Sequence, residues 1–207
     1  EATENHGPAL AYLIEFLADE SDSQITTAVV SQLVANYPGT PEGHYGLARL
    51  GLRSGNYQMA LENAERVVEL EPEWVEAQLL YARMLVITGS TEEGLALAQS
   101  IAEEQPELEV HLQYAELLLS AGRHEPARDL LDGILSDNPG LPEAVRALAF
   151  LTLTLDDLEA SKGHFTDLRG QPRYRDEAFF YLGQNSSMLF LFLVQIVCVY
   201  IHFDLLI

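Results

Sequence analysis

Histidine and cysteine are the side chains of this 207-residue chain whose chemistry is most specific. The six histidines are His6, His44, His111, His124, His164 and His202, and no two of them have the HExxH spacing of a zinc protease. Cys198 is the single cysteine, it lies in an apolar segment, and the sequence places no base near it. We therefore expect no catalytic residue, no metal and no cofactor.

Two glycine-containing segments resemble phosphate loops only superficially. They are GSTEEG at residues 89–94 and GRHEPA at residues 122–127. A phosphate loop follows a β-strand, whereas each of these segments lies between two predicted helices. The sequence gives no reason to expect a bound nucleotide.

Arginine is the side chain with the clearest binding chemistry. The chain has 11 basic residues against 32 acidic ones, a formal charge of −21, and Lys162 is the one lysine. A surface with this charge would repel nucleic acids. The guanidinium group binds carboxylates through two parallel hydrogen bonds, so the positions of the few arginines matter.

A repeat of about 34 residues positions these side chains. Prolines recur in steps of 34, 34, 33 and 33 residues, at Pro38, Pro72, Pro106, Pro139 and Pro172. Small residues follow the same step at Ala48, Ala82, Ala115 and Ala149, and again at Ala60, Gly94, Ala127 and Ser161. A turn glycine recurs at Gly55, Gly89 and Gly122, and a large apolar residue at Val67, Ile101, Ile134 and Leu168. Each unit has room for two amphipathic helices separated by a glycine turn.

These columns resemble the tetratricopeptide repeat (TPR) family over roughly residues 7–183. The resemblance implies an all-α, right-handed solenoid of stacked helix-turn-helix units, with five repeats and a partial sixth. After a polar lead-in at residues 1–6, we place the repeats at about 7–40, 41–74, 75–108, 109–141, 142–174 and 175–184. The first repeat departs from the small-residue columns and is expected to act as an N-terminal cap.

The resemblance also implies that the first helix of each repeat lines a concave groove that binds a peptide or a partner helix. The expected groove residues are Tyr45, Arg49, Leu52, Arg53, Leu79, Arg83, Val86, Leu112, Leu119, Arg146 and Phe150. Four of the ten arginines lie on this stripe, which favours an acidic peptide or a C-terminal carboxylate as ligand. The alternative is that these arginines pair with glutamates of adjacent repeats.

Residues 185–207 break the repeat pattern. Residues 188–207 are almost wholly apolar, with Asp204 as the one formal charge, and are long enough to cross a bilayer as a helix. Three interpretations stay open: a membrane anchor, a helix that caps the last repeat, or sequence that is not native to the repeat protein. Phe179, Phe180 and Tyr181 lie just before this break and are expected to promote self-association if they are exposed.

The sequence therefore predicts a non-catalytic scaffold or adaptor for protein–protein interaction. One alternative is a membrane-tethered envelope assembly factor that uses the apolar tail as its anchor. Another is an enzyme whose catalytic domain lies in flanking sequence. The resemblance to bacterial TPR proteins favours the cell envelope or periplasm over the cytoplasm.

Overall fold

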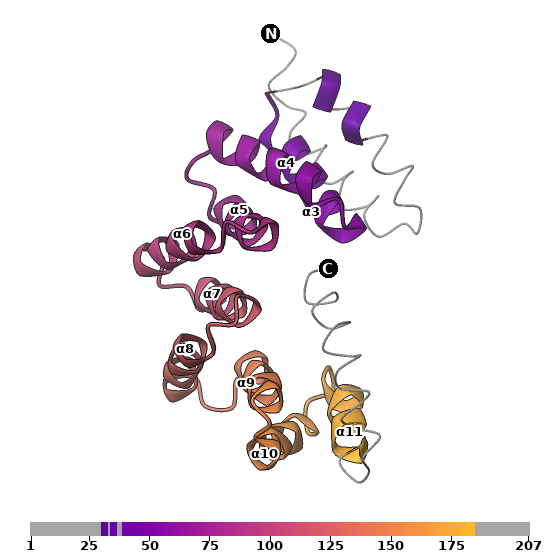
Figure 1. Cartoon of the computed structure of the whole chain (residues 1–207), viewed down its shortest axis with the longest axis vertical. Helices are drawn as coiled ribbons and strands as arrows, with labels where there is room; N and C mark the ends of the chain where they lie inside the picture. Colours follow the sequence, from indigo (N-terminus) through magenta and orange to yellow (C-terminus); the bar gives the residue numbers. More distant parts are fainter. Residues whose placement is uncertain (1–29, 33, 37–38, 185–207) are drawn as a thin grey trace. The chain divides into compact units, whose positions relative to one another are not determined.

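The computed structural model describes residues 30–32, 34–36 and 39–184 (Figure 1). All regular secondary structure in these residues is α-helical, which confirms the predicted all-α class. The described residues form two compact units that divide between Glu103 and Glu104, in the last turn of α6. The lead-in, most of the first repeat and the apolar tail lie outside the described residues.

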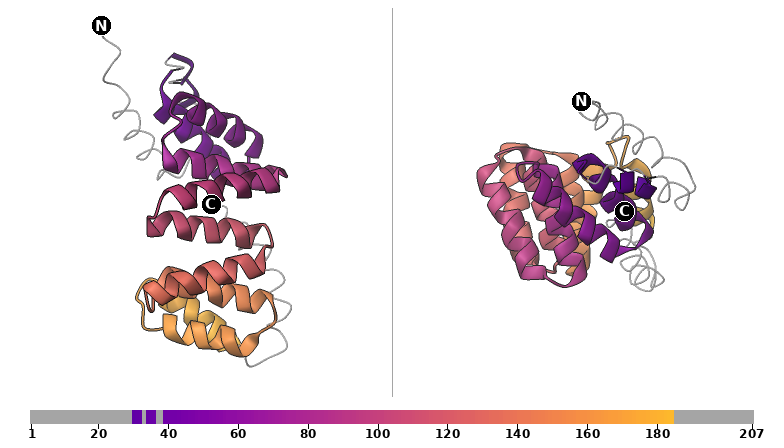
Figure 2. Two further views of the ribbon diagram at one scale, coloured as in Figure 1. Left: turned by 90° about the vertical axis from the view of Figure 1, so that its left-hand side faces the viewer. Right: turned by 90° about the horizontal axis from the view of Figure 1, so that it is seen from above.

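The helices come in pairs separated by short turns. The first unit contains α3 (Pro41–Ser54), α4 (Tyr57–Leu70), α5 (Val75–Thr88) and α6 (Thr91–Glu104). The second contains α7 (Leu108–Ser120), α8 (His124–Asp137), α9 (Pro142–Thr154), α10 (Leu158–Leu168) and α11 (Arg175–Gln184). Within each unit, consecutive helices lie side by side, as the left view of Figure 2 shows.

The turn between the two helices of a pair needs a left-handed residue. Gly55, Gly89 and Gly122 have φ angles of 75°, 105° and 70°. Asp156 stands one repeat step after Gly122 and has a φ of 61°, although it is not a glycine. Its N–H bonds to the carbonyl of Leu153 and the next N–H to that of Thr152, which closes the end of α9 with a Schellman motif.

The small-residue columns mark where the paired helices touch. Ala48, Ala82, Ala115 and Ala149 are fully buried. A Cβ added to Gly94 would lie 2.5 Å from the carbonyl oxygen of Ala82, so only glycine lets α5 and α6 approach this closely. In the last pair, the hydroxyl of Ser161 donates a hydrogen bond of 3.1 Å to the carbonyl of Ala149. The predicted columns therefore correspond to contacts between the two helices of a pair.

Aromatic stacking holds the second unit together at its C-terminal end. Phe165 of α10 is 1% exposed and stacks on Tyr181 of α11 with ring centroids 4.7 Å apart. Phe150 of α9 meets both rings edge-on, at 5.4 and 5.2 Å. Burying side chains of this size stabilises a fold by about 1.5–3 kcal/mol each. α11 is thus part of the packed core of its unit.

None of the helices in the described part of the chain is both long and apolar enough to span a bilayer. The segment considered as a membrane anchor, residues 188–207, lies outside that part.

Candidate partner-binding face

The predicted groove residues of the first unit lie on α3 and α5 with different exposures. Arg49 is exposed, whereas Tyr45, Arg53, Arg83 and Val86 are half-buried. The side chain of Val86 lies against Gly94, at the close approach of α5 and α6. Arginine and tyrosine therefore form the accessible part of this stripe.

Leu52 and Leu79 lie deeper than the stripe predicts. Leu52 is 7% exposed and packs with Ala48 and Ala60, and Leu79 is 3% exposed. Both side chains pack between helices. The i, i+3 and i+4 pattern of a single helix defines one broad apolar face, and it does not separate the positions that pack against a neighbouring helix from those that stay open.

Tyr45, Trp74 and Arg49 form a small cluster on the first unit. The rings of Tyr45 and Trp74 are 4.7 Å apart at their centroids, and the guanidinium carbon of Arg49 lies 5.9 Å from the Tyr45 ring, within cation–π range. Trp74 caps the N-terminus of α5, where its carbonyl accepts hydrogen bonds from Ala77 and Gln78. The predicted stripe does not include Trp74, because this residue precedes the helix. The sequence singles it out in one respect, since it is the one tryptophan of the chain.

Charge is segregated between the helices of the first unit. The first helices of the pairs, α3 and α5, carry three arginines and two glutamates, a net charge of +1. The second helices, α4 and α6, carry one arginine and seven glutamates, a net charge of −6. In a chain of formal charge −21, α3 and α5 are thus a local region where an anion meets little repulsion.

The first helices of the second unit differ in charge. α7, α9 and α11 carry two arginines against five acids, a net charge of −3. Leu112 and Leu119 of α7 are half-buried and pack against the core around Leu148. The predicted stripe therefore has less positive charge here than in the first unit.

Arg146 already binds a carboxylate. Its Nε donates to Oε2 of Glu177 at 2.7 Å and its Nη2 donates to Oε1 at 2.9 Å, with 26% and 27% of the two side chains exposed. Burial alone would lower the pKa of Arg146, but the hydrogen bond and charge of Glu177 outweigh it and raise the pKa. The alternative of pairing with an adjacent repeat is therefore correct for Arg146, which joins α9 to α11.

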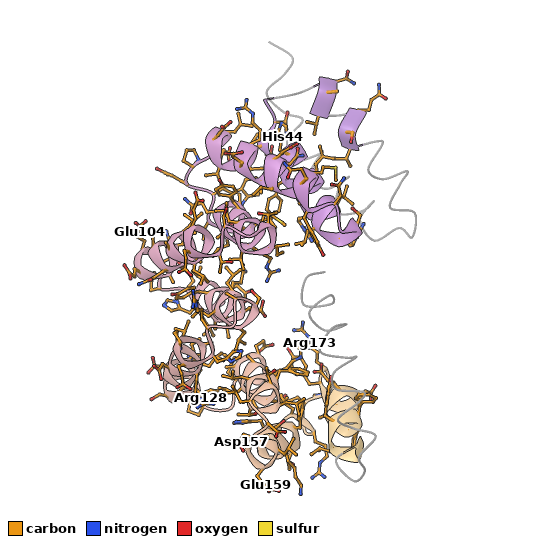
Figure 3. The ribbon with its side chains drawn as sticks, viewed as in Figure 1. His44, Glu104, Arg128, Asp157, Glu159 and Arg173 are labelled. Carbon is orange, nitrogen blue, oxygen red and sulfur yellow. The ribbon has the colours of Figure 1, made fainter. Side chains whose placement is uncertain are left out.

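A second polar contact fixes the connection that leads into α11. The hydroxyl of Tyr174 donates to Oε1 of Glu143 at 3.1 Å, and Arg173, labelled in Figure 3, lies 3.6 Å from the same oxygen. Burial, followed by the hydrogen bond and charge of Glu143, raises the pKa of Tyr174. The phenol therefore remains a hydrogen-bond donor at neutral pH. Two charged residues of α9, the acid Glu143 and the base Arg146, thus hold α11 and the segment that leads into it.

The sequence matches two profiles of one family. Both are described as tetratricopeptide repeat, and they match residues 45–109 and 95–151, together about half of the chain. The chain belongs to the TPR family. The stacked helix-turn-helix arrangement predicted from the columns is confirmed by this match and by the folds of solved TPR proteins.

Several solved structures share the TPR fold of this chain. TTC0263, a TPR protein of Thermus thermophilus, is 20% identical with a TM-score of 0.69, covering 86% of this chain and 97% of its own. PilW, a type IV pilus biogenesis factor, is 15% identical with a TM-score of 0.69, covering 93% and 100%. YrrB, a TPR protein with an unusual peptide-binding site, is 13% identical with a TM-score of 0.55, covering 84% and 90%. Identities this low establish the fold alone.

No curated protein matches the TPR chain in sequence. Within residues 30–32, 34–36 and 39–184, no group of three or more histidine, cysteine, aspartate or glutamate side chains is arranged to hold a metal ion. His44, labelled in Figure 3, has a structural contact instead: its Nδ1 lies 2.9 Å from Oδ1 of Asn63, whose Nδ2 donates to the carbonyl of Met59. The accessible chemistry of α3 and α5 is therefore that of arginine and aromatic rings.

Proposed function

We propose that this TPR chain is a non-catalytic scaffold or adaptor that binds an acidic peptide or partner helix on the face formed by α3 and α5. The observation that carries this proposal is the segregation of charge in the first unit, with +1 on the first helices and −6 on the second helices. A partner with acidic residues would meet attraction on one side of the unit and repulsion on the other.

The residue types on this face support peptide binding. Arginine and aromatic residues contribute most of the binding energy in protein interfaces, and both are accessible on α3. The similar fold YrrB is described as having a peptide-binding site, which agrees with such a use of the TPR fold. The four arginines of the predicted stripe are not equivalent in this proposal, since Arg146 is held by Glu177.

Affinity capture from a lysate of the source organism tests this function. The full chain is compared with the double variant Tyr45→Ala plus Arg49→Glu, and with Arg66→Glu as a matched control. Arg66 is exposed on the second helix α4, where it forms an i, i+3 pair with Glu69. We expect specific partners to be lost from the α3 variant and kept by the Arg66 variant. A partner set that is the same for all three proteins would refute the proposed face.

A further inference from the structure

An aromatic–arginine pair occurs on the first helix of two different repeats. Tyr45 and Arg49 lie four residues apart on α3, and Arg146 and Phe150 lie four residues apart on α9. The two pairs are 101 residues apart, as are the buried Ala48 and Ala149, so they occupy the same repeat positions with the order exchanged. In both pairs the guanidinium lies near the ring, at 5.9 Å on α3 and 4.9 Å on α9.

The pair on α9 shows which group such a site takes. Arg146 holds the carboxylate of Glu177 with two hydrogen bonds, at 2.7 and 2.9 Å, while the Phe150 ring lies on the guanidinium. The ring of Tyr174 adds a second aromatic contact at 5.9 Å. Glu177 comes from the same folded unit, so its effective concentration is high and an external carboxylate competes poorly for Arg146.

The pair on α3 also combines an arginine with a ring, and Glu76 of α5 stands at the repeat position of Glu177, but no ion pair joins Glu76 to Arg49. Arg49 is exposed, and within the described ranges no carboxylate lies within ion-pair distance of it. Trp74 supplies a second ring here, 4.7 Å from Tyr45, whereas the second ring on α9's side, Tyr174, lies 5.9 Å from the Arg146 guanidinium itself. The helices α3 and α5 carry a net charge of +1, and two exposed glutamates, Glu71 and Glu73, lie just before Trp74.

We infer that Arg49, with Tyr45 and Trp74, is the carboxylate-binding site of this protein and that Arg146 is its internally closed counterpart. The ligand is an acidic peptide whose carboxylate occupies the Arg49 fork and whose neighbouring apolar side chain lies on the Trp74 ring. This inference rests on the proposed function and gives it a single anchoring arginine.

Trp74 is the one tryptophan of the chain, so its fluorescence reports on this site alone. The full chain is titrated with acetyl-Leu-Glu-Glu-Leu-amide, with its glutamine analogue as an amide, and with that analogue as a free acid. We expect a saturable change with the glutamate peptide and none with the glutamine amide. A response to the free acid identifies the C-terminal carboxylate as a further source of the group that Arg49 binds.

Variants of two arginines complete the test. Arg49→Gln is expected to weaken binding of the glutamate peptide roughly tenfold, and Arg49→Lys by less, because lysine keeps the charge but lacks the fork. Arg66→Gln on α4 is the matched control and should leave the affinity unchanged. Circular dichroism establishes that each variant is folded.

Three outcomes would overturn the inference. They are equal binding of the glutamate and glutamine amides, unchanged affinity in Arg49→Gln, and no fluorescence change with any peptide at millimolar concentration. The proposed function is judged separately, because the capture experiment can still identify partners that depend on the α3 face without a carboxylate at Arg49.

Discussion

A half-buried carboxylate partner changes what an arginine can do. Arg146 and Glu177 are each about one-quarter exposed and share two hydrogen bonds, whereas Arg66 and Glu69 pair at a similar distance with 45% and 56% of their side chains exposed. Water and salt weaken the exposed pair, and holding its long side chains in place costs entropy. The two pairs therefore differ in energy although their shortest distances are both 2.7 Å.

A double-mutant cycle on Arg146→Gln and Glu177→Gln measures this difference. We expect a coupling energy of about 1–2 kcal/mol, because either single variant leaves a half-buried charge without its partner. The cycle on Arg66→Gln and Glu69→Gln is the control and should give less than about 0.5 kcal/mol. Urea unfolding provides the free energies. Equal coupling in the two cycles would contradict the assigned role of burial.

For single residues, the sequence predicts which helix a side chain lies on better than it predicts which side chain it contacts. The repeat register placed Arg49 and Arg146 on first helices, where the structure has them. It could not assign Glu177 to Arg146, because that contact depends on how α11 packs across α9. Leu52 and Leu79 were expected to face a ligand, but both are buried. Their burial depends on how neighbouring helices pack, and the apolar pattern of a single helix carries no information about that packing.

At the scale of the helix pair, the recurring columns predict contacts because each has a steric cause. Gly94 faces the backbone of Ala82, and Ser161 bonds to the backbone of Ala149, so both positions require a small side chain. The turn column continues at Asp156, which a search for glycine alone does not find. Aspartate is one of the few residues other than glycine that adopt the left-handed conformation.

Two glycine substitutions separate close approach from helix propensity. Gly94→Ala is expected to destabilise the chain by about 1–3 kcal/mol, since the new methyl group must push α6 away from α5. Gly133→Ala lies within α8 with nothing in the way of its Cβ, and should stabilise the chain by roughly 0.5–1 kcal/mol. Thermal unfolding followed by circular dichroism compares them. A melting temperature that rises in both variants would show that α5 and α6 tolerate a Cβ at Gly94.

For the molecule as a whole, charge and apolar surface have opposite effects on self-association. The formal charge of −21 opposes contact between copies, particularly at low salt. Phe179 and Phe180 of α11 are 53% and 46% exposed and favour such contact. Tyr181, the third aromatic residue considered for self-association, is 4% exposed because it packs on Phe165. The apolar surface that α11 offers is therefore the two phenylalanines.

We accordingly expect the full chain to self-associate through α11, and to do so more strongly as added salt screens its charge. The double variant Phe179→Ser plus Phe180→Ser should sediment as a monomer at concentrations where the unmodified chain does not. Leu155, which caps the end of α9, and Leu158, the first residue of α10, are 40% and 39% exposed and provide a control of similar exposure. Their double serine variant should sediment as the unmodified chain does. If the phenylalanine and leucine variants behave alike, exposed apolar area in general, rather than the face of α11, governs association.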